Sequence, residues 1–99
     1  SYDDDFENAQ KVLLEVLEKN ELVDDTQPKT VEILEFAASS VNLAVRCYVK
    51  NSDYWTAYWQ LYRAVKKALD ENNISMPYPH TEMIIKNENS TTIPFDNKN

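Results

Sequence analysis

Apolar residues recur at steps of three and four along the first twenty positions, which is the spacing of one face of an α-helix. The stripe runs from Phe6 to Leu17 and includes Ala9 and Leu13. The sequence therefore predicts a helix that ends near residue 20. Three aspartates directly precede Phe6, and we expect them to cap the helix, because its N-terminal dipole favours negative charge.

A second stripe with the same spacing follows Asp53, a good N-cap residue. Trp59 lies about 110° from the centre of this stripe at about 100° per residue, too far round to be comfortably buried. We expect it either under a neighbouring loop or against another subunit. The stripe itself is expected to supply much of the core through Tyr54, Tyr58, Leu61, Tyr62, Val65 and Leu69.

Two neighbouring segments between the helices are typical of β-strands. The segment "TVEILEF" (30–36) is rich in β-branched and aromatic residues, and residues 41–49 alternate between apolar and mostly polar positions. The alternation predicts one buried face and one partly exposed face. Because the link is short, we expect antiparallel pairing. Arg46 projects from the exposed face, where Glu32 or Glu35 is expected to give a cross-strand ion pair.

The stretch "NNISMPYPHTEMII" (72–85) predicts where the second helix ends. Asn73 takes the left-handed cap position that usually holds glycine, so that Ile74 can fold back onto the last helical turn. Pro77 and Pro79 then keep the chain extended and prevent the helix from resuming. A short apolar strand, "TEMII", follows at once.

The predicted order is helix, strand, strand, helix, strand. It favours an α+β fold, a two-layer ferredoxin-like sandwich of two helices on a small, mainly antiparallel sheet. Residues 1–86 would form the domain, ending in a strand at 82–86, and residues 87–99 a flexible polar tail. A ferredoxin-like sheet also has a central strand before its first helix. Only Ser1 and Tyr2 could belong to it, so we expect the first strand to be largely missing.

The composition limits the possible functions. The 99 residues include 10 basic and 17 acidic ones, and the net charge of −7 argues against nucleic-acid binding. Glycine is absent, which excludes a glycine-rich phosphate-binding loop and the dinucleotide fingerprint. No apolar run approaches the roughly 20 residues that cross a bilayer. Because the chain opens at Ser1 without methionine, we expect it to be a piece of a longer protein.

The few residues that could carry chemistry have simpler explanations. His80 has no second histidine, so we expect a surface or interface position rather than a metal or catalytic role. Cys47 alternates with valines on the buried strand face and is expected to be a core thiol. Asp3, Asp4 and Asp5 lack the glycine and distal glutamate of a calcium loop. No nucleophile with a neighbouring base can be defined, so we predict no catalysis, no metal and no cofactor.

Four segments follow one another in a specific order: "YDDDFENA" (2–9), "SSVNLAVRCYV" (39–49), "DYW" at the start of the second helix, and "ISMPYP" (74–79). Together they resemble the carboxyl-terminal cytoplasmic domain of the small-conductance mechanosensitive channel family. The resemblance covers about residues 2–85, and the ordered combination is far more specific than any one segment. The family usually has glycine where this chain has Asn73.

The resemblance implies a homoheptameric channel of the bacterial inner membrane that opens under tension and releases ions and small osmolytes during hypo-osmotic shock. Seven copies of this domain would form the wall of a cytoplasmic vestibule. Contact with the membrane would be made only by transmembrane helices outside this chain. The strand at 82–86 would join its counterparts on the symmetry axis. The isolated chain would be a monomer or small oligomer. The expected subunit-interface residues are Trp59, Pro77, Tyr78, Pro79, Met83, Ile84 and Ile85.

The missing first strand leaves a pairing edge in the predicted sheet. We expect that place to be filled by another copy, filled by the tail around "TTIPF", or left open. The alternative function is a free-standing ferredoxin-like regulatory module that binds a small metabolite. Such a module needs a polar pocket, which the sequence does not locate.

Overall fold

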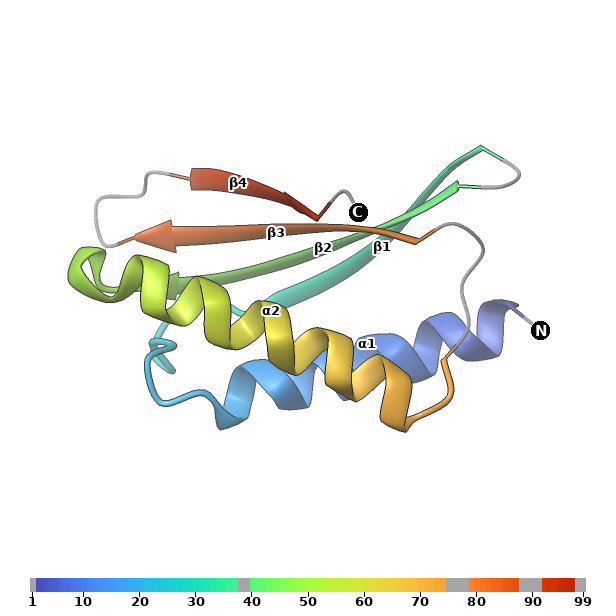
Figure 1. Cartoon of the computed structure of the whole chain (residues 1–99), viewed down its shortest axis with the longest axis horizontal. Coiled ribbons are helices and arrows are strands. Elements are labelled where there is room, and N and C mark those ends of the chain that lie inside the picture. The colour runs from blue at the N-terminus through green and yellow to red at the C-terminus, as the bar shows by residue number, and fades with distance from the viewer. Residues whose placement is uncertain (1, 38–39, 75–78, 88–91, 98–99) are drawn as a thin grey trace.

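The computed structural model describes residues 2–37, 40–74, 79–87 and 92–97. Figure 1 shows α1 and α2 side by side on one face of a sheet. The prediction of an α+β fold with two helices on a mainly antiparallel sheet is confirmed. The elements follow in the order α1 (Tyr2–Lys19), β1 (Thr30–Ala37), β2 (Ser40–Val49), the 3₁₀ turn η1 (Asn51–Asp53), α2 (Tyr54–Glu71), β3 (Pro79–Asn87) and β4 (Thr92–Asn97).

The sheet has the strand order β1-β2-β3-β4. Strands β1 and β2 pair antiparallel, as expected from the short link between them. Strands β2 and β3 pair in parallel, with Val41 opposite Pro79 and Val49 opposite Asn87. Parallel neighbours need a long crossover connection, and α2 supplies it by returning the chain along the sheet. Strand β4 then pairs antiparallel with β3 at the other edge.

The end of the chain differs from the sequence-based expectation. The place beside β2 is not left open, nor is it taken by "TTIPF": β3 of the same chain occupies it. Residues 92–97, within the predicted polar tail, form the edge strand β4, where Pro94 lies opposite Ile84. An edge strand tolerates proline because its outer side has no ladder hydrogen bonds to lose. The proline and the polar residues on both sides of this strand are the reason why the sequence does not predict it.

Helix α1 begins earlier than predicted. It starts at Tyr2, so the three aspartates lie inside its first turn instead of preceding it as caps. Negative charge in the first turn still complements the positive end of the helix dipole, so this composition favours the observed start.

The core lies between the two helices and the facing side of the sheet. The stripes of both helices and the alternate positions of β2 meet there, as the two periodicities predict. Ala44 is 2% exposed although it lies on the opposite face of β2, so that face is less exposed than the alternation suggested. The buried cluster comprises Ala9, Leu13, Leu17, Val23, Val31, Leu43, Val45, Cys47, Val49, Tyr54, Ala57, Tyr58, Leu61, Val65, Ala68 and Ile85.

The loop between α1 and β1 is tied to its surroundings. The Asn20 side-chain amide donates to Gln60 Oε1 at 2.9 Å, which joins the end of α1 to α2. The backbone N–H of Asp24 donates to the Tyr48 carbonyl at 2.8 Å, which holds the loop against β2. The loop is therefore a fixed part of the domain surface.

The end of α2 confirms the predicted asparagine cap. Asn73 has φ 53°, the left-handed conformation. Its N–H donates to the Asp70 carbonyl at 3.1 Å, and the N–H of Ile74 donates to the Leu69 carbonyl at 3.0 Å. These two bonds are the pattern of a Schellman cap, and Ile74 packs against the core as that motif requires.

Replacing Asn73 with alanine is expected to lower the free energy of unfolding by about 1–2 kcal/mol, because a Cβ without a local polar partner disfavours the left-handed conformation. Asn73→Gly should keep or slightly raise stability, since glycine adopts that conformation without a steric cost. Urea unfolding of the two variants measures the difference. Equal stability of both variants would contradict the assigned cap.

Candidate assembly surface

The outward side of α2 carries an unusual run of aromatic and basic residues. Trp55, Trp59, Tyr62, Arg63 and Lys66 are spaced by four, three, one and three residues, which places them on one side of a helix. We call these five residues the α2 strip. They lie beside the buried stripe of Tyr54, Tyr58, Leu61 and Val65, and Tyr62 at the boundary is half-buried against the core. Helix α2 therefore presents one side to the core and a distinct aromatic side to the surroundings.

The rings along α2 are in mutual contact. Trp55 and Tyr58 stack with centroids 5.1 Å apart, and Tyr58 and Trp59 stack at 4.8 Å. Trp59 then meets Tyr62 edge-on at 5.8 Å, and the Lys66 ammonium lies 5.3 Å from the Tyr62 ring centroid. Such spacings are in the favourable range for aromatic and cation–π pairs. The rings form a preordered surface that loses little side-chain entropy on contact with a partner.

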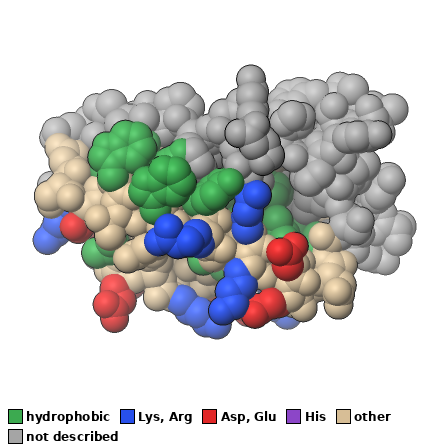
Figure 2. Space-filling view, in the orientation of Figure 1, with side chains coloured by type: hydrophobic (Ala, Val, Ile, Leu, Met, Phe, Trp, Pro, Cys, Tyr) green, Lys and Arg blue, Asp and Glu red, His purple; other side chains and the backbone are tan. Residues whose placement is uncertain are grey.

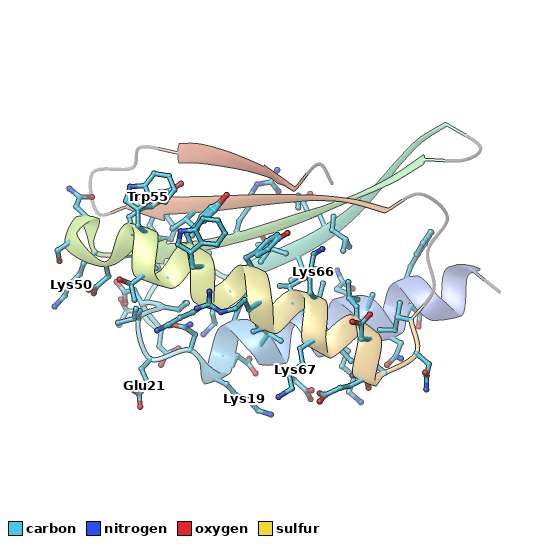
Figure 3. All side chains as sticks on the ribbon, viewed as in Figure 1. Lys19, Glu21, Lys50, Trp55, Lys66 and Lys67 are labelled. Atoms are coloured by element: carbon cyan, nitrogen blue, oxygen red, sulfur yellow. The ribbon has the colours of Figure 1, made fainter. Side chains whose placement is uncertain are left out.

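This surface is accessible. Trp55 is 62% exposed and Trp59 is 47% exposed, and they are the large hydrophobic residues that stand out among the described side chains. Figure 2 shows hydrophobic side chains gathered along the upper edge of α2, with Lys and Arg side chains beside them. Figure 3 places Trp55 and Lys66 on the same upper side of α2, whereas Lys67 points to the lower side. Paired exposed tryptophans are typical of contact surfaces.

The residues predicted for the subunit interface lie in different parts of the structure. Trp59 is exposed, and so is Trp55, which the sequence analysis did not single out. The signal for Trp55 was the aromatic spacing of three and four along α2. Ile85 is 1% exposed and is covered by its own chain, paired with Cys47. Of the others, Pro79, Met83 and Ile84 lie in β3, and Pro77 and Tyr78 fall outside the described residues.

Two smaller predictions about β2 are confirmed. Arg46 forms an ion pair with Glu32 across the β1–β2 ladder, and both side chains are partly exposed. Cys47 is buried in the core, and burial raises the pKa of its thiol to about 12. The thiol is therefore kept protonated and unreactive. His80 lies in β3, and its side chain is outside the described ones.

A polar pocket of about 650 Å³ opens beside the loop after α1. The pocket includes Asp24, which accepts hydrogen bonds from the Thr26 hydroxyl and N–H, so the pKa of its carboxyl is lowered. Asp25 is ion-paired with Lys29 at 2.9 Å, and this pairing raises the pKa of Lys29. The described residues contain no cluster of three potential metal ligands. The carboxylates of Asp24 and Asp25 are thus explained by local turn and ion-pair contacts.

The arrangement defines a small α+β domain with exposed aromatic residues along α2. The family model "Mechanosensitive ion channel MscS, C-terminal" matches residues 1–76. The chain therefore belongs to the MscS family of mechanosensitive channels and corresponds to its C-terminal domain. Because this is a family of channels and not of enzymes, the prediction of a non-catalytic protein is confirmed.

The chain is 42% identical over 83 residues to an uncharacterised MscS family protein of Buchnera aphidicola from Acyrthosiphon pisum, covering 84% of this chain and 27% of that protein. It is 36% identical to the small-conductance mechanosensitive channel of Edwardsiella ictaluri, covering 84% of this chain and 29% of the channel. The corresponding channel of Helicobacter pylori is 31% identical, with 91% and 33% covered.

The chain thus spans about a third or less of the curated relatives it matches. No solved structure matches it. Within the described part of the chain, neither helix has the length and apolar character needed to cross a membrane.

Proposed function

We propose that this domain is part of the cytoplasmic wall of a small-conductance mechanosensitive channel, which opens under membrane tension and releases ions and small osmolytes on hypo-osmotic shock. The channel would be a homoheptamer in the bacterial inner membrane, with this domain on the cytoplasmic side. The family match over residues 1–76 supports the proposal, as do relatives in Edwardsiella and Helicobacter that carry the channel name.

The observation that carries the structural role is the exposed aromatic side of α2. Trp55 and Trp59 lie exposed next to the buried core, and an exposed apolar surface of this kind marks a contact with a partner. Within the proposed heptamer, neighbouring copies of the domain are the available partners. We therefore assign the domain an assembly role without chemistry of its own.

Strand β3 has two alternative pairings in this proposal. In a single chain, β3 pairs with β2 along nine residues of each strand, from Pro79 to Asn87. In the heptamer, the strand at 82–86 would pair with its counterparts on the symmetry axis, with Pro77, Tyr78, Pro79, Met83 and Ile84 at the contact. The two pairings compete for the same backbone groups, since a strand has only two edges and β4 occupies the other.

The experiment is osmotic rescue. The intact protein that carries this chain is expressed in a bacterial strain lacking its own mechanosensitive channels, and survival is counted after transfer from high to low osmolarity. Survival should rise well above the empty-vector level, and Leu61→Asp, which places a carboxylate in the core, should abolish the gain. Survival at the vector level, with the intact protein present in the membrane fraction, would refute the proposal.

A further inference from the structure

We propose that the α2 strip of one copy docks on the outward side of α1 in the next copy. The inference rests on the proposed function, because it names the contact by which neighbouring domains would meet in the channel. The partner surface on α1 consists of Glu7, Lys11, Leu14, Glu15 and Glu18, which we call the α1 strip.

The α1 strip forms a shallow groove. Its five residues line a depression of about 540 Å³ together with Gln10. Leu14 is half-buried and gives the groove an apolar floor, whereas Glu7, Glu15 and Glu18 are exposed around it. An apolar floor with a carboxylate rim suits a partner that offers aromatic rings and cations together.

The two strips have the same length and opposite charges. Each has the same spacing of four, three, one and three residues, so each covers about 16 Å of helix at about 1.5 Å per residue. Three glutamates and one lysine give the α1 strip a charge of −2, whereas Arg63 and Lys66 give the α2 strip +2. The Trp59 and Tyr62 rings can cover Leu14 while the cations face the glutamates.

The contact must lie between copies. Within one chain, α1 and α2 lie side by side and already pack through their buried residues. The charged residues of both strips and the two tryptophans are exposed. A contact between two different surfaces is heterologous, so each added copy exposes a new strip, and the assembly grows until a ring closes. A lipid surface is a poorer partner, because the chain as a whole carries −7 and anionic headgroups would repel it.

The test is a charge exchange in the 99-residue chain, followed by sedimentation velocity at protein concentrations up to about 1 mM. Arg63→Glu with Lys66→Glu makes both strips acidic, and Glu15→Lys with Glu18→Lys makes both basic. Each double variant should associate at least about tenfold more weakly than the original chain. A chain carrying all four changes has complementary strips again and should regain association. Mixing the two double variants should also restore it.

The controls separate docking from general charge and from misfolding. Lys19→Glu with Lys50→Glu makes the same charge change as the first variant but lies off both strips, and should associate like the original chain. Far-UV circular dichroism checks the fold of each variant. Association of the unmodified chain should weaken between about 0.1 M and 1 M salt, because the Debye length falls from about 10 Å to about 3 Å.

Three results would overturn the proposal: an unmodified chain that stays monomeric throughout, double variants that associate like it, or a four-fold variant that regains nothing. Osmotic rescue is read separately from sedimentation. If the protein restores survival but its association does not depend on the strips, the proposed docking is rejected and the channel function is kept. If the chain associates through the strips but the protein does not restore survival, the channel function is rejected and the contact between copies is kept.

Discussion

Replacing Leu61 with alanine is expected to lower the free energy of unfolding by about 2–5 kcal/mol. Leu61 lies at the centre of the buried side of α2 and is 0% exposed. The change removes buried apolar surface and leaves a cavity that the surrounding side chains fill only in part. Since a domain of this size has a stability of about 5–15 kcal/mol, the loss is a large share of the total.

Urea unfolding followed by circular dichroism measures this effect. Leu14→Ala is the matched control, because Leu14 has the same side chain but is only partly buried against the core. Its loss should be clearly smaller than that of Leu61→Ala. If the two variants unfolded at the same urea concentration, the assignment of Leu61 to the core would be wrong.

The Cys47 thiol is expected to react with a thiol reagent at pH 8 about a thousandfold more slowly in the folded chain than in the unfolded one. Burial raises its pKa from 9.0 to about 12, and the reactive species is the thiolate. A shift of this size lowers the thiolate fraction by about three powers of ten at any pH below the unfolded pKa.

Labelling with a chromogenic disulfide, with and without denaturant, gives the ratio. A Cys47→Ala chain with Ser52→Cys is the control, since Ser52 is exposed and its replacement should react quickly in the folded state. Rapid labelling of Cys47 in the native chain would contradict its burial.

The same shift predicts a pH dependence of stability. Below about pH 9 the Cys47 thiol is protonated in both the folded and the unfolded chain, so its contribution does not change with pH. Between about pH 9 and 12 the unfolded chain releases the proton while the folded chain retains it. The unfolded state then binds fewer protons, and the contribution of this group to stability falls as pH rises.

Local chemistry explains why much of the fold could be predicted from the sequence. The spacing of Leu13 and Leu17, or of Leu61 and Val65, determines the buried side of each helix, whatever the strand order. The cap at Asn73 was also predictable, because few residues other than glycine adopt the left-handed conformation. Both features depend on residues that are close in the sequence.

Pairing between distant segments was harder to predict. The parallel pairing of β3 with β2 depends on how α2 returns the chain along the sheet, and periodicity carries no information about strand order. Strand β4 was hidden by Pro94. The α2 strip was recognised only at Trp59, because a helical projection shows the distance from the buried stripe but not the ring contacts that join Trp55 to it.

The two sides of each helix have different roles in the proposed assembly. Their inward sides stabilise a self-contained core, so a single copy can fold before it meets another. Their outward sides carry opposite charges and an aromatic surface, which a fold needs only if it has a partner. Changes at Leu61 should therefore affect stability, whereas changes at Arg63 or Lys66 should affect association and leave stability nearly unchanged.

The most direct test of the channel assignment is electrical recording from membrane patches of cells that express the intact protein and lack other mechanosensitive channels. Suction on the patch should open a conductance that closes when the tension is released and that is absent from vector controls. A patch that contains the protein but passes no tension-dependent current would contradict the assignment of this domain to a working channel.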